Sequence, residues 1–380
     1  MTTPEPCRSL YVHVPFCRSL CGYCDFYSEV LDPRAARPLV DALLAELDSY
    51  ARRRPLAWDT IFVGGGTPTV LPVPDLSHLL AGIRRFAGPD GDLEFSVEAN
   101  PATVSPAVAE ALAVAGVNRV SVGAQSFDPG ELRVLDRTHT PEQVADTVAI
   151  LRAAGLRRLS LDLIFGIPGQ TLASWLRSLQ AALSLSPEHL SCYGLTYEPG
   201  TPLCAARDAG RVIPVEEDVE AEMYIAAMNT LAAAGLHQYE LSNYARPGAE
   251  CRHNLRYWRN EPYLGIGPAA AGYLDGVRYK NVADTAAYVQ AIVAGRSPRG
   301  EAETLPRERK MGETAMLNLR TAEGIDRSRF LSRFGSDPAI VFARAIERHT
   351  AAGLLEADGC GIRLTRAGRL VADRVMADFV

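Results

Sequence analysis

Residues 14–27 read Val-Pro-Phe-Cys-Arg-Ser-Leu-Cys-Gly-Tyr-Cys-Asp-Phe-Tyr and place Cys17, Cys21 and Cys24 in a C-x3-C-x2-C spacing. Thiolates are the protein ligands that iron–sulfur clusters prefer. Because one residue spans at most about 3.3–3.6 Å, a loop this short can gather all three sulfurs around one compact centre. Three cysteines without a fourth indicate a cluster that leaves one iron open to other ligands.

Three other interpretations of these cysteines are weaker. A zinc site would need four nitrogen or sulfur ligands, and no fourth cysteine or histidine stands nearby. A disulfide would fit a secreted protein, but the sequence shows no secretory signal and its cysteines are scattered. Chance clustering is disfavoured because the other five cysteines show no ligand spacing: Cys7, Cys192, Cys204, Cys251 and Cys360.

Size and charge narrow the class of protein. With 380 residues, 47% of them hydrophobic, the chain can form one large domain and a smaller one. The formal net charge of −6 does not indicate a nucleic-acid partner. No apolar stretch is long enough to span a bilayer, and residues 1–6 are polar. We therefore expect a cytoplasmic protein, in a reducing compartment where free thiolates can hold iron.

The chain alternates β-rich runs with amphipathic helical segments such as 38–50 and 108–115. Repeated βα units predict a parallel sheet, either doubly wound or closed into a barrel. The polar and glycine-rich residues follow the predicted strands, as at the active-site rim of (β/α) barrels. Because six units are fewer than eight, we expect an α/β fold with an incomplete (β/α)6 barrel. The predicted strands are 10–14, 60–63, 93–99, 119–124, 159–164 and 190–195.

We expect three parts in the chain. Residues 1–235 form the partial barrel with the cluster, and residues 236–300, rich in glycine and aromatics, form a connecting segment. Residues 301–380 form a smaller, mostly helical, winged-helix-like domain with a hairpin across Asp358-Gly359 and a last helix from Arg366. Given the acidic balance, packing over the barrel mouth is favoured for this domain over DNA binding.

The run Gly64-Gly65-Gly66-Thr67-Pro68 lacks the Gly-Lys-Ser/Thr ending of a phosphate-binding loop. It is either an ordinary tight turn or backbone that a ligand approaches closely. Beside the cysteine loop, the second interpretation gains weight.

Four further polar side chains fall on the same predicted rim. Glu98 ends a strand, Gln125 and Arg137 can donate to a carboxylate, and Asp162 is a charge in an apolar strand. A buried acid needs a partner, and a ribose hydroxyl would be one. Each alone is more often a structural residue, but together they favour an amino-acid–nucleoside ligand.

Together the cysteine motif, the Gly-Gly-Gly-Thr-Pro run and the strand-end residues resemble the radical S-adenosylmethionine proteins. In that family three cysteines bind a [4Fe–4S] cluster, and S-adenosylmethionine binds the fourth iron and is cleaved to methionine and a 5′-deoxyadenosyl radical. The segments Tyr11-Val-His-Val-Pro-Phe-Cys17, Gly123-Ala-Gln-Ser-Phe127 and Asp162-Leu-Ile-Phe-Gly-Ile-Pro-Gly169 look like the oxygen-independent coproporphyrinogen III oxidase group. The resemblance implies that Cys17, Cys21 and Cys24 hold the cluster. It places at the S-adenosylmethionine site Tyr11, Tyr23, Gly65, Gly66, Thr67, Glu98, Gln125, Arg137, Asp162 and Thr196.

Three features separate the chain from the true oxidases of that group and point to its haem-chaperone branch. The oxidases usually read C-x3-C-x2-C-x-C, whereas Phe26 stands two residues after Cys24 here. They carry a long extension before the cluster, whereas 16 residues precede Cys17. His253-Asn-Leu-Arg-Tyr-Trp258 matches the HNxxYW motif of the chaperone branch.

The role of His253 depends on this resemblance. A neutral imidazole is a common axial ligand of haem iron, and Tyr257 and Trp258 could pack on a porphyrin face. Residue chemistry alone favours His253 and Asn254 as partners of backbone groups in a loop. With the resemblance, haem contact by His253 is favoured, and Cys251 is an alternative or additional ligand.

The resemblance implies a haem chaperone of porphyrin metabolism that holds a [4Fe–4S] cluster, S-adenosylmethionine and haem. It would transfer haem to acceptor proteins, membrane-bound respiratory proteins among the candidates, and a homodimer could form around the cysteine loop. The cluster would act as a redox or assembly switch rather than as a turnover engine. One alternative is a radical enzyme that decarboxylates coproporphyrinogen III to protoporphyrinogen IX. Another is a structural iron–sulfur protein whose cluster clamps a loop.

Overall fold

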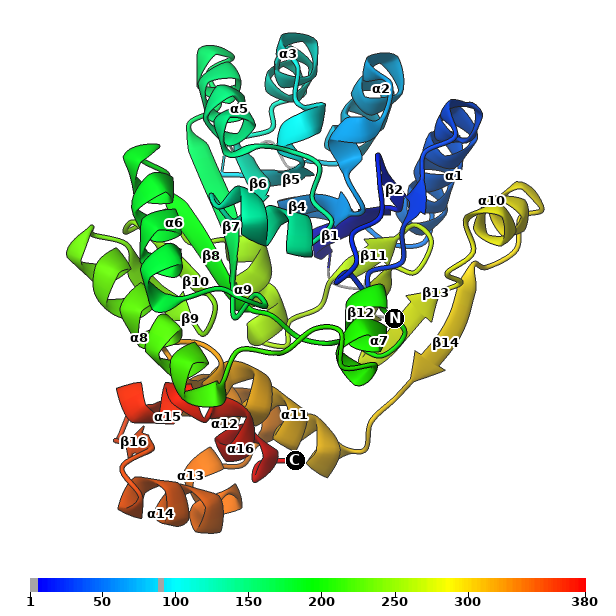
Figure 1. Ribbon diagram of the computed structural model, residues 1–380. Helices are drawn as coiled ribbons and strands as arrows, with labels where there is room; N and C mark the ends of the chain where they lie inside the picture. The colour runs from blue at the N-terminus through cyan, green and yellow to red at the C-terminus, as the bar shows by residue number, and fades with distance from the viewer. Residues whose placement is uncertain (1–5, 88–91) are drawn as a thin grey trace.

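A computed structural model describes residues 6–87 and 92–380, so residues 1–5 and 88–91 of the first predicted part lie outside it. Its main sheet has nine strands in the order β11-β1-β4-β5-β6-β7-β8-β10-β9 (Figure 1). The six strands expected from the sequence are present and pair in parallel, so the partial-barrel prediction is confirmed. They are β1 (Cys7–Val14), β4 (Leu56–Gly65), β5 (Glu94–Ala99), β6 (Arg119–Gln125), β7 (Arg158–Phe165) and β8 (His189–Gly194).

The middle part of the chain, residues 236–300, contributes more than a connection. Strand β11 (Leu264–Ile266) pairs in parallel with β1, and β10 (Asn243–Ala245) and β9 (His237–Glu240) extend the other edge antiparallel. A separate sheet contains β12 (Ala271–Leu274), β13 (Val277–Asn281) and β14 (Arg299–Glu303). Helices α9 (Arg252–Trp258) and α10 (Thr285–Val293) complete the segment.

Helices follow the parallel strands and lie outside the sheet (Figure 1). Capping explains where they begin: Ser105, Thr140 and Thr171 each accept a backbone N–H of the following first turn. The first helix begins at Pro33 rather than at 38, because Asp32 caps it and a proline is well tolerated in the first turn. The outer helices are α1 (Pro33–Ala51), α2 (Val73–Arg84), α3 (Pro106–Val114), α5 (Pro141–Ala153), α6 (Leu172–Ser184) and α8 (Glu217–Ala233).

Short elements occupy the loops at the ends of the strands. Strands β2 (Phe16–Cys17) and β3 (Glu29–Val30) bracket the cysteine loop. The others are the 3₁₀ turns Pro68–Val70 and Pro101–Thr103 and the helices α4 (Pro129–Val134) and α7 (Pro202–Asp208).

The last part of the chain has the helix and strand order of a winged helix. Its strands pair in the order β15-β17-β16, and the predicted hairpin is present, with Asp358 accepting the N–H groups of Cys360 and Gly361 at 2.8 Å. A helix begins at Arg366 as predicted. The elements are α11 (Arg307–Leu319), β15 (Ile325–Asp326), α12 (Arg327–Phe334), α13 (Pro338–Val341), α14 (Ala343–Ala351), β16 (Leu355–Ala357), β17 (Gly361–Leu364), α15 (Arg366–Leu370) and α16 (Ala372–Ala377).

The described residues form two large hydrophobic cores and one small cluster. One core runs from Cys7 to Tyr288 and the other from Met311 to Phe379. The small cluster contains Leu135, Ile164, Ile167, Leu195 and Leu203. The division at residues 235 and 300 stays a prediction.

The winged-helix part lies beside α8, β9 and α9, with Arg366 bonded to Asn229 and Arg369 to Gln238 at 2.7 Å. No described residue beyond 300 lines the cavity at the barrel mouth, so the expectation that this part covers the mouth is wrong.

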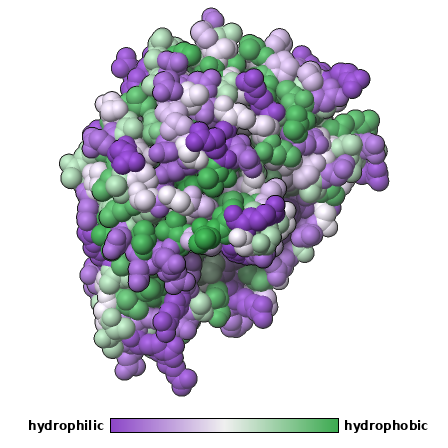
Figure 2. All heavy atoms as spheres, in the orientation of Figure 1, coloured by the Kyte–Doolittle hydropathy of each residue, from purple (hydrophilic) through white to green (hydrophobic). Residues whose placement is uncertain are grey.

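Hydrophilic side chains are spread over the whole face seen in Figure 2, between smaller hydrophobic patches. Among the helices of residues 6–87 and 92–380, none combines the length and the apolar character that a bilayer crossing requires.

Candidate functional site

A cavity of about 450 Å³ opens at the carboxyl ends of the parallel strands, and Cys17, Cys21 and Cys24 line it together. Nine of the other residues predicted for the site also line it: Tyr23, Gly65, Gly66, Thr67, Glu98, Gln125, Arg137, Asp162 and Thr196. Tyr11 does not line it, because its hydroxyl is turned to Nδ1 of His13 at 3.0 Å. His253 does not line it either.

The cysteine loop is held at its base. Strands β2 and β3 close it, and the N–H of Leu31 donates to the carbonyl of Cys17 at 3.0 Å. His13 contacts the carbonyl of Tyr27 through Nε2 at 2.9 Å. Inside the loop, the N–H of Cys24 donates to the carbonyl of Cys21 at 3.3 Å. The loop therefore presents its sulfurs from a fixed base.

The electrostatics of the three thiols call for a cationic centre. Burial raises the pKa of Cys17, and burial with the neighbouring sulfurs raises the pKa of Cys24 to about 11. Thr67 donates to Sγ of Cys17 at 3.7 Å, and Nη1 of Arg137 lies 3.5 Å from Sγ of Cys21. Because neighbouring thiolates repel each other, bound iron would supply the charge that keeps all three deprotonated. The donor set fits an iron–sulfur cluster.

The glycine run is required by close approach. A Cβ on Gly64 would lie 2.7 Å from the carboxyl carbon of Glu98, and one on Gly66 would lie 2.7 Å from the carbonyl oxygen of Phe16. Gly65 has φ +107°, a conformation that favours glycine, and its N–H donates to Oε2 of Glu98 at 3.1 Å. The run is therefore more than an ordinary tight turn.

Glu98 and Asp162 are two of the four carboxylates that line the cavity, with Asp25 and Glu198. Both oxygens of Asp162 accept from Ser121 at 2.9 Å, and one also accepts from Ser160 at 3.2 Å. Burial, and then the charge of Asp162, raise the pKa of Glu98 to about 7. A ligand that brings positive charge or hydroxyl donors would reduce the repulsion between the carboxylates of Glu98 and Asp162.

Between the strands that carry Glu98 and Asp162, the backbone is strained at a cavity residue of β6. Gln125 has φ +62°, at a register shift between β6 and β7, and non-glycine residues in this region often mark functional sites. Arg137 donates through Nη2 to the carbonyl of Gly123 at 2.8 Å. Within the described part of the chain its buried Nε has no hydrogen-bond partner, so a ligand acceptor can take it.

Sequence reasoning missed Ser121 and Tyr193, which also line the cavity. Ser121 shares a face of β6 with Gly123 and Gln125, because alternate residues of a strand point the same way. This periodicity could have found Ser121, whereas a search restricted to strand ends could not.

The structure places His253 in the barrel interior, away from the cysteines. The side chain is fully buried, with Nδ1 at 2.9 Å from Thr60 and Nε2 at 2.8 Å from the hydroxyl of Tyr257. Both ring nitrogens are thus engaged, and neither is open to iron. Cys251 is also buried, with Sγ at 3.6 Å from Glu94. Axial ligation by either residue is at odds with this arrangement.

The chain is similar in sequence and in structure to several known proteins. Residues 11–182 match the Radical SAM superfamily, and residues 305–371 match the HemN C-terminal domain. The "Heme chaperone HemW" of Bacillus subtilis is 36% identical over 375 residues, covering 98% of this chain and 99% of that protein. The protein of the same name from Escherichia coli is 42% identical over 271 residues, covering 70% of each. The structure of coproporphyrinogen III oxidase (HemN) from Escherichia coli superposes with a TM-score of 0.85 at 24% identity, covering 98% of this chain and 90% of that one, which shows a shared fold.

Proposed function

The chain belongs to the radical SAM superfamily and, within it, to the HemW heme chaperone family, and from this premise we propose that it binds haem and transfers it to acceptor proteins. We propose further that Cys17, Cys21 and Cys24 hold one [4Fe–4S] cluster and that S-adenosylmethionine occupies the cavity beside them. The acceptors are haem-dependent proteins, and the protein works in the cytoplasm.

The observation that carries the cluster assignment is the convergence of three thiols, the carboxylates of Glu98 and Asp162 and the guanidinium of Arg137 on a single cavity. When bound, the cluster supplies one-electron chemistry. Arg137 donates through Nη1 to Sγ of Cys21 at 3.5 Å. Glu98 accepts the cationic amino group of the ligand, and Asp162, already holding Ser121, accepts from a ribose hydroxyl.

Two observations favour the chaperone over the decarboxylase. The position where the oxidases usually carry a fourth cysteine is Phe26, whose side chain is 65% exposed beside the cysteine loop. Identity is 36% and 42% to the two proteins named as heme chaperones, against 24% to the oxidase of known structure.

Leu20 and Val30 are also exposed near the cysteine loop, which supports the proposal that the loop is a homodimer contact.

Anaerobically reconstituted protein tests this proposal. We expect tight haem binding in an absorption titration and transfer of the bound haem to an apo-haem protein faster than from buffer. Incubation with coproporphyrinogen III, S-adenosylmethionine and a reductant should give no protoporphyrinogen. Product formation without haem transfer would establish the decarboxylase, and absence of both would leave a structural iron–sulfur protein.

A further inference from the structure

The hydroxyl group of Tyr27 joins the cysteine loop to helix α10. Its oxygen accepts the backbone N–H of Thr285 at 2.9 Å and lies 3.2 Å from Oγ1 of the same residue. A tyrosine hydroxyl can accept one hydrogen bond and donate another, so both contacts can form at once. Thr285 is the first residue of α10 and lies 258 residues from Tyr27 along the chain. Two hydrogen bonds thus link the end of the loop to a distant part of the sequence.

Tyr27 stands on the Cys24 side of the loop, three residues after that cysteine. The other two cysteines are held by other elements. Cys17 lies in β2, and the carbonyl of the residue after Cys21 accepts the N–H of Leu203 at 2.8 Å. Each of the three cysteines therefore has an attachment nearby, and Tyr27 provides the one beside Cys24.

Helix α10 is a fixed partner for this contact. Its Tyr288 is fully buried and donates to Oε2 of Glu46 on α1 at 2.5 Å, and α10 lies beside α1 (Figure 1). Glu46 is 1% exposed and also accepts from the N–H of Gly267 and from Nδ2 of Asn281, both at 3.0 Å. Because a buried carboxylate with three donors is costly to disturb, α10 holds Thr285 in a defined place.

We propose that Tyr27 and Thr285 are positioning residues of the cluster site, a proposal that rests on the proposed function because it takes the three cysteines as the cluster ligands. The two hydroxyl groups fix the backbone after Cys24 and, through it, the position of the Cys24 sulfur. A sulfur that moves away from the cluster would expose iron to water and to chelators. Because the loop is ordered before the cluster binds, less entropy is lost on binding. The contact between Tyr27 and Thr285 thus slows the loss of iron.

Release of iron from anaerobically reconstituted protein to a ferrous chelator, followed by absorption, tests this role. Tyr27→Phe removes one hydroxyl group, and Thr285→Val removes the other but leaves the backbone N–H. We expect the rate of release to rise about fivefold in Tyr27→Phe and about twofold in Thr285→Val, because the first loses both hydrogen bonds and the second loses one. Thr285→Ser keeps the hydroxyl and should release iron at the wild-type rate.

A double-mutant cycle shows whether the two hydroxyl groups act as a pair. The double variant Tyr27→Phe/Thr285→Val should release iron no faster than Tyr27→Phe, since the contact is already lost in the single variant. The EPR spectrum of the reduced cluster adds a readout that overall stability does not move. It reports the arrangement of ligands around the irons, so it should change in Tyr27→Phe and keep its wild-type form in Thr285→Ser.

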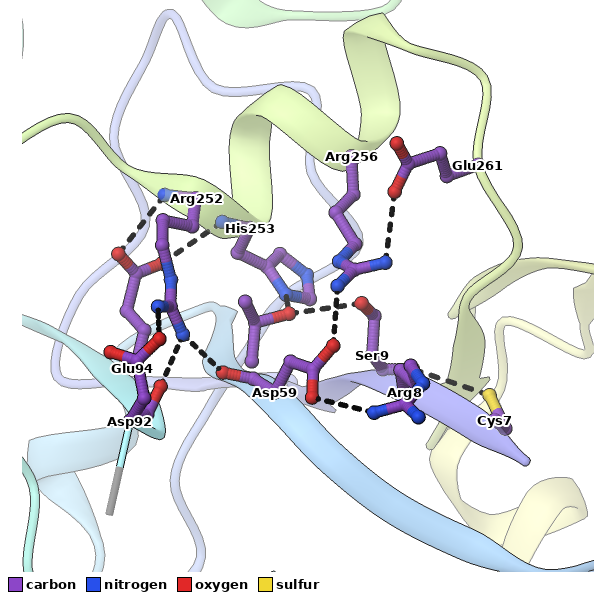
Figure 3. Close-up of polar contacts among 11 residues, drawn as sticks. Cys7, Arg8, Ser9, Asp59, Asp92, Glu94, Arg252, His253, Arg256 and Glu261 are labelled. Carbon is purple, nitrogen blue, oxygen red and sulfur yellow. Dashed lines mark hydrogen bonds and ion pairs between the residues drawn. The ribbon is translucent and has the colours of Figure 1, made fainter. Parts of the chain in front are cut away.

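Thr60→Val is the matched control for the loss of a threonine hydroxyl. Thr60 is 1% exposed and Thr285 is 7% exposed. The partners of Thr60 are Ser9 at 3.0 Å and His253 at 2.9 Å. Both partners belong to the polar network of Figure 3, and Thr60 does not line the cysteine cavity. Thr60→Val should therefore lower the free energy of unfolding in urea and leave the rate of iron release unchanged.

The outcomes separate this proposal from the proposed function. Wild-type protein that holds no cluster would overturn both. Wild-type rates and spectra in Tyr27→Phe would overturn the positioning role alone and leave the cluster assignment in place. Equally fast release from Thr60→Val would overturn it too, because the effect would then follow overall stability. A double variant whose rate is the product of the two single effects would show that Tyr27 and Thr285 do not act as a pair.

Discussion

Nδ1 of His253 lies 2.9 Å from the hydroxyl oxygen of Thr60, and this contact joins α9 to β4 inside the barrel. Thr60 donates its own proton to Ser9 at 3.0 Å. The imidazole must therefore donate from Nδ1, and its Nε2 accepts from Tyr257 at 2.8 Å. Both nitrogens of the neutral ring are therefore hydrogen-bonded, and the ring anchors α9 to the barrel.

Replacing His253 with alanine should destabilise the protein. The change removes a buried ring and leaves Thr60 and Tyr257 without their partner, so we expect a loss of about 3 kcal/mol in the free energy of unfolding. Urea denaturation measures it, with His237→Ala, an exposed histidine, as the control. In folded His253→Ala protein the haem absorption bands should keep their wild-type positions. A shifted band would show that His253 is an axial ligand of the haem iron.

The same residue predicts a pH dependence of stability. Burial, with the charge of Arg256, lowers the pKa of His253 to about 3, against 6.5 in the unfolded chain. Between these values the unfolded state binds a proton that the folded state does not, so stability falls as pH falls from 6.5 towards 3. From pH 6.5 to 5 the loss is about 2 kcal/mol.

Comparison of unfolding free energies at pH 7 and pH 5 for the wild type and His253→Phe isolates this contribution. Lowered pKa values of His13, His139 and His189 act in the same direction in both proteins. The difference between the two curves should therefore shrink at pH 5. Parallel curves would mean that His253 is not held as a neutral group.

The parallel strands were predictable because their signals are local. A β-rich run, a polar or glycine-rich turn and a capped helix recur within a few dozen residues, and the turn residues mark the carboxyl ends that meet at the cavity. The cysteine loop and Gly65 were found in this way. The side chain of Ser121 was missed because it lies within β6 rather than at its end.

What escaped prediction depends on distant partners. Strand β11 has three residues, and its pairing with β1 joins segments more than 250 residues apart. The face of α9 that turns inward is set by Glu94 and Thr60, which lie 159 and 193 residues from His253 along the chain. The sequence of α9 alone does not distinguish a histidine aimed at a ligand from one aimed at the core.

The cysteine assignment predicts a sharp contrast between two serine variants. Cys17→Ser should lose the absorption of the reconstituted cluster, because Sγ of Cys17 lines the cavity with the other two cysteines. Cys360→Ser should keep it, since Cys360 is exposed and outside the cavity. Iron and sulfide content per chain measures both. Equal cluster content in the two variants would remove Cys17 from the ligand set.

The raised pKa of Glu98 predicts that the affinity for S-adenosylmethionine depends on pH. Its pKa is raised to about 7 by burial and by the charge of Asp162. Above this value the carboxylate is charged and binds cationic S-adenosylmethionine, so affinity should fall as pH falls through 7, by up to tenfold per unit. Glu98→Gln should bind at least about tenfold more weakly and lose the inflection. Isothermal titration measures it, with the surface variant Glu142→Gln as control. An inflection that survives in Glu98→Gln would assign it to another group.

Gly66 gives a test of close packing at the cavity. An added Cβ would lie 2.7 Å from the carbonyl oxygen of Phe16 and 2.8 Å from that of Pro15. Backbone atoms cannot move aside as a flexible side chain can, so Gly66→Ala must displace the base of the cysteine loop. We expect a loss of about 1–3 kcal/mol in the free energy of unfolding and weaker retention of the cluster.

Gly359→Ala is the matched control, because an added Cβ there meets no atom within 4 Å. If Gly66→Ala unfolds at the same urea concentration as Gly359→Ala and keeps its cluster, the backbone at Pro15 and Phe16 can move to accommodate the added Cβ. If only the cluster is lost, the displacement reaches the sulfurs but not the core. That second result would show that Gly66 maintains the geometry of the cysteines through the carbonyl groups of Pro15 and Phe16.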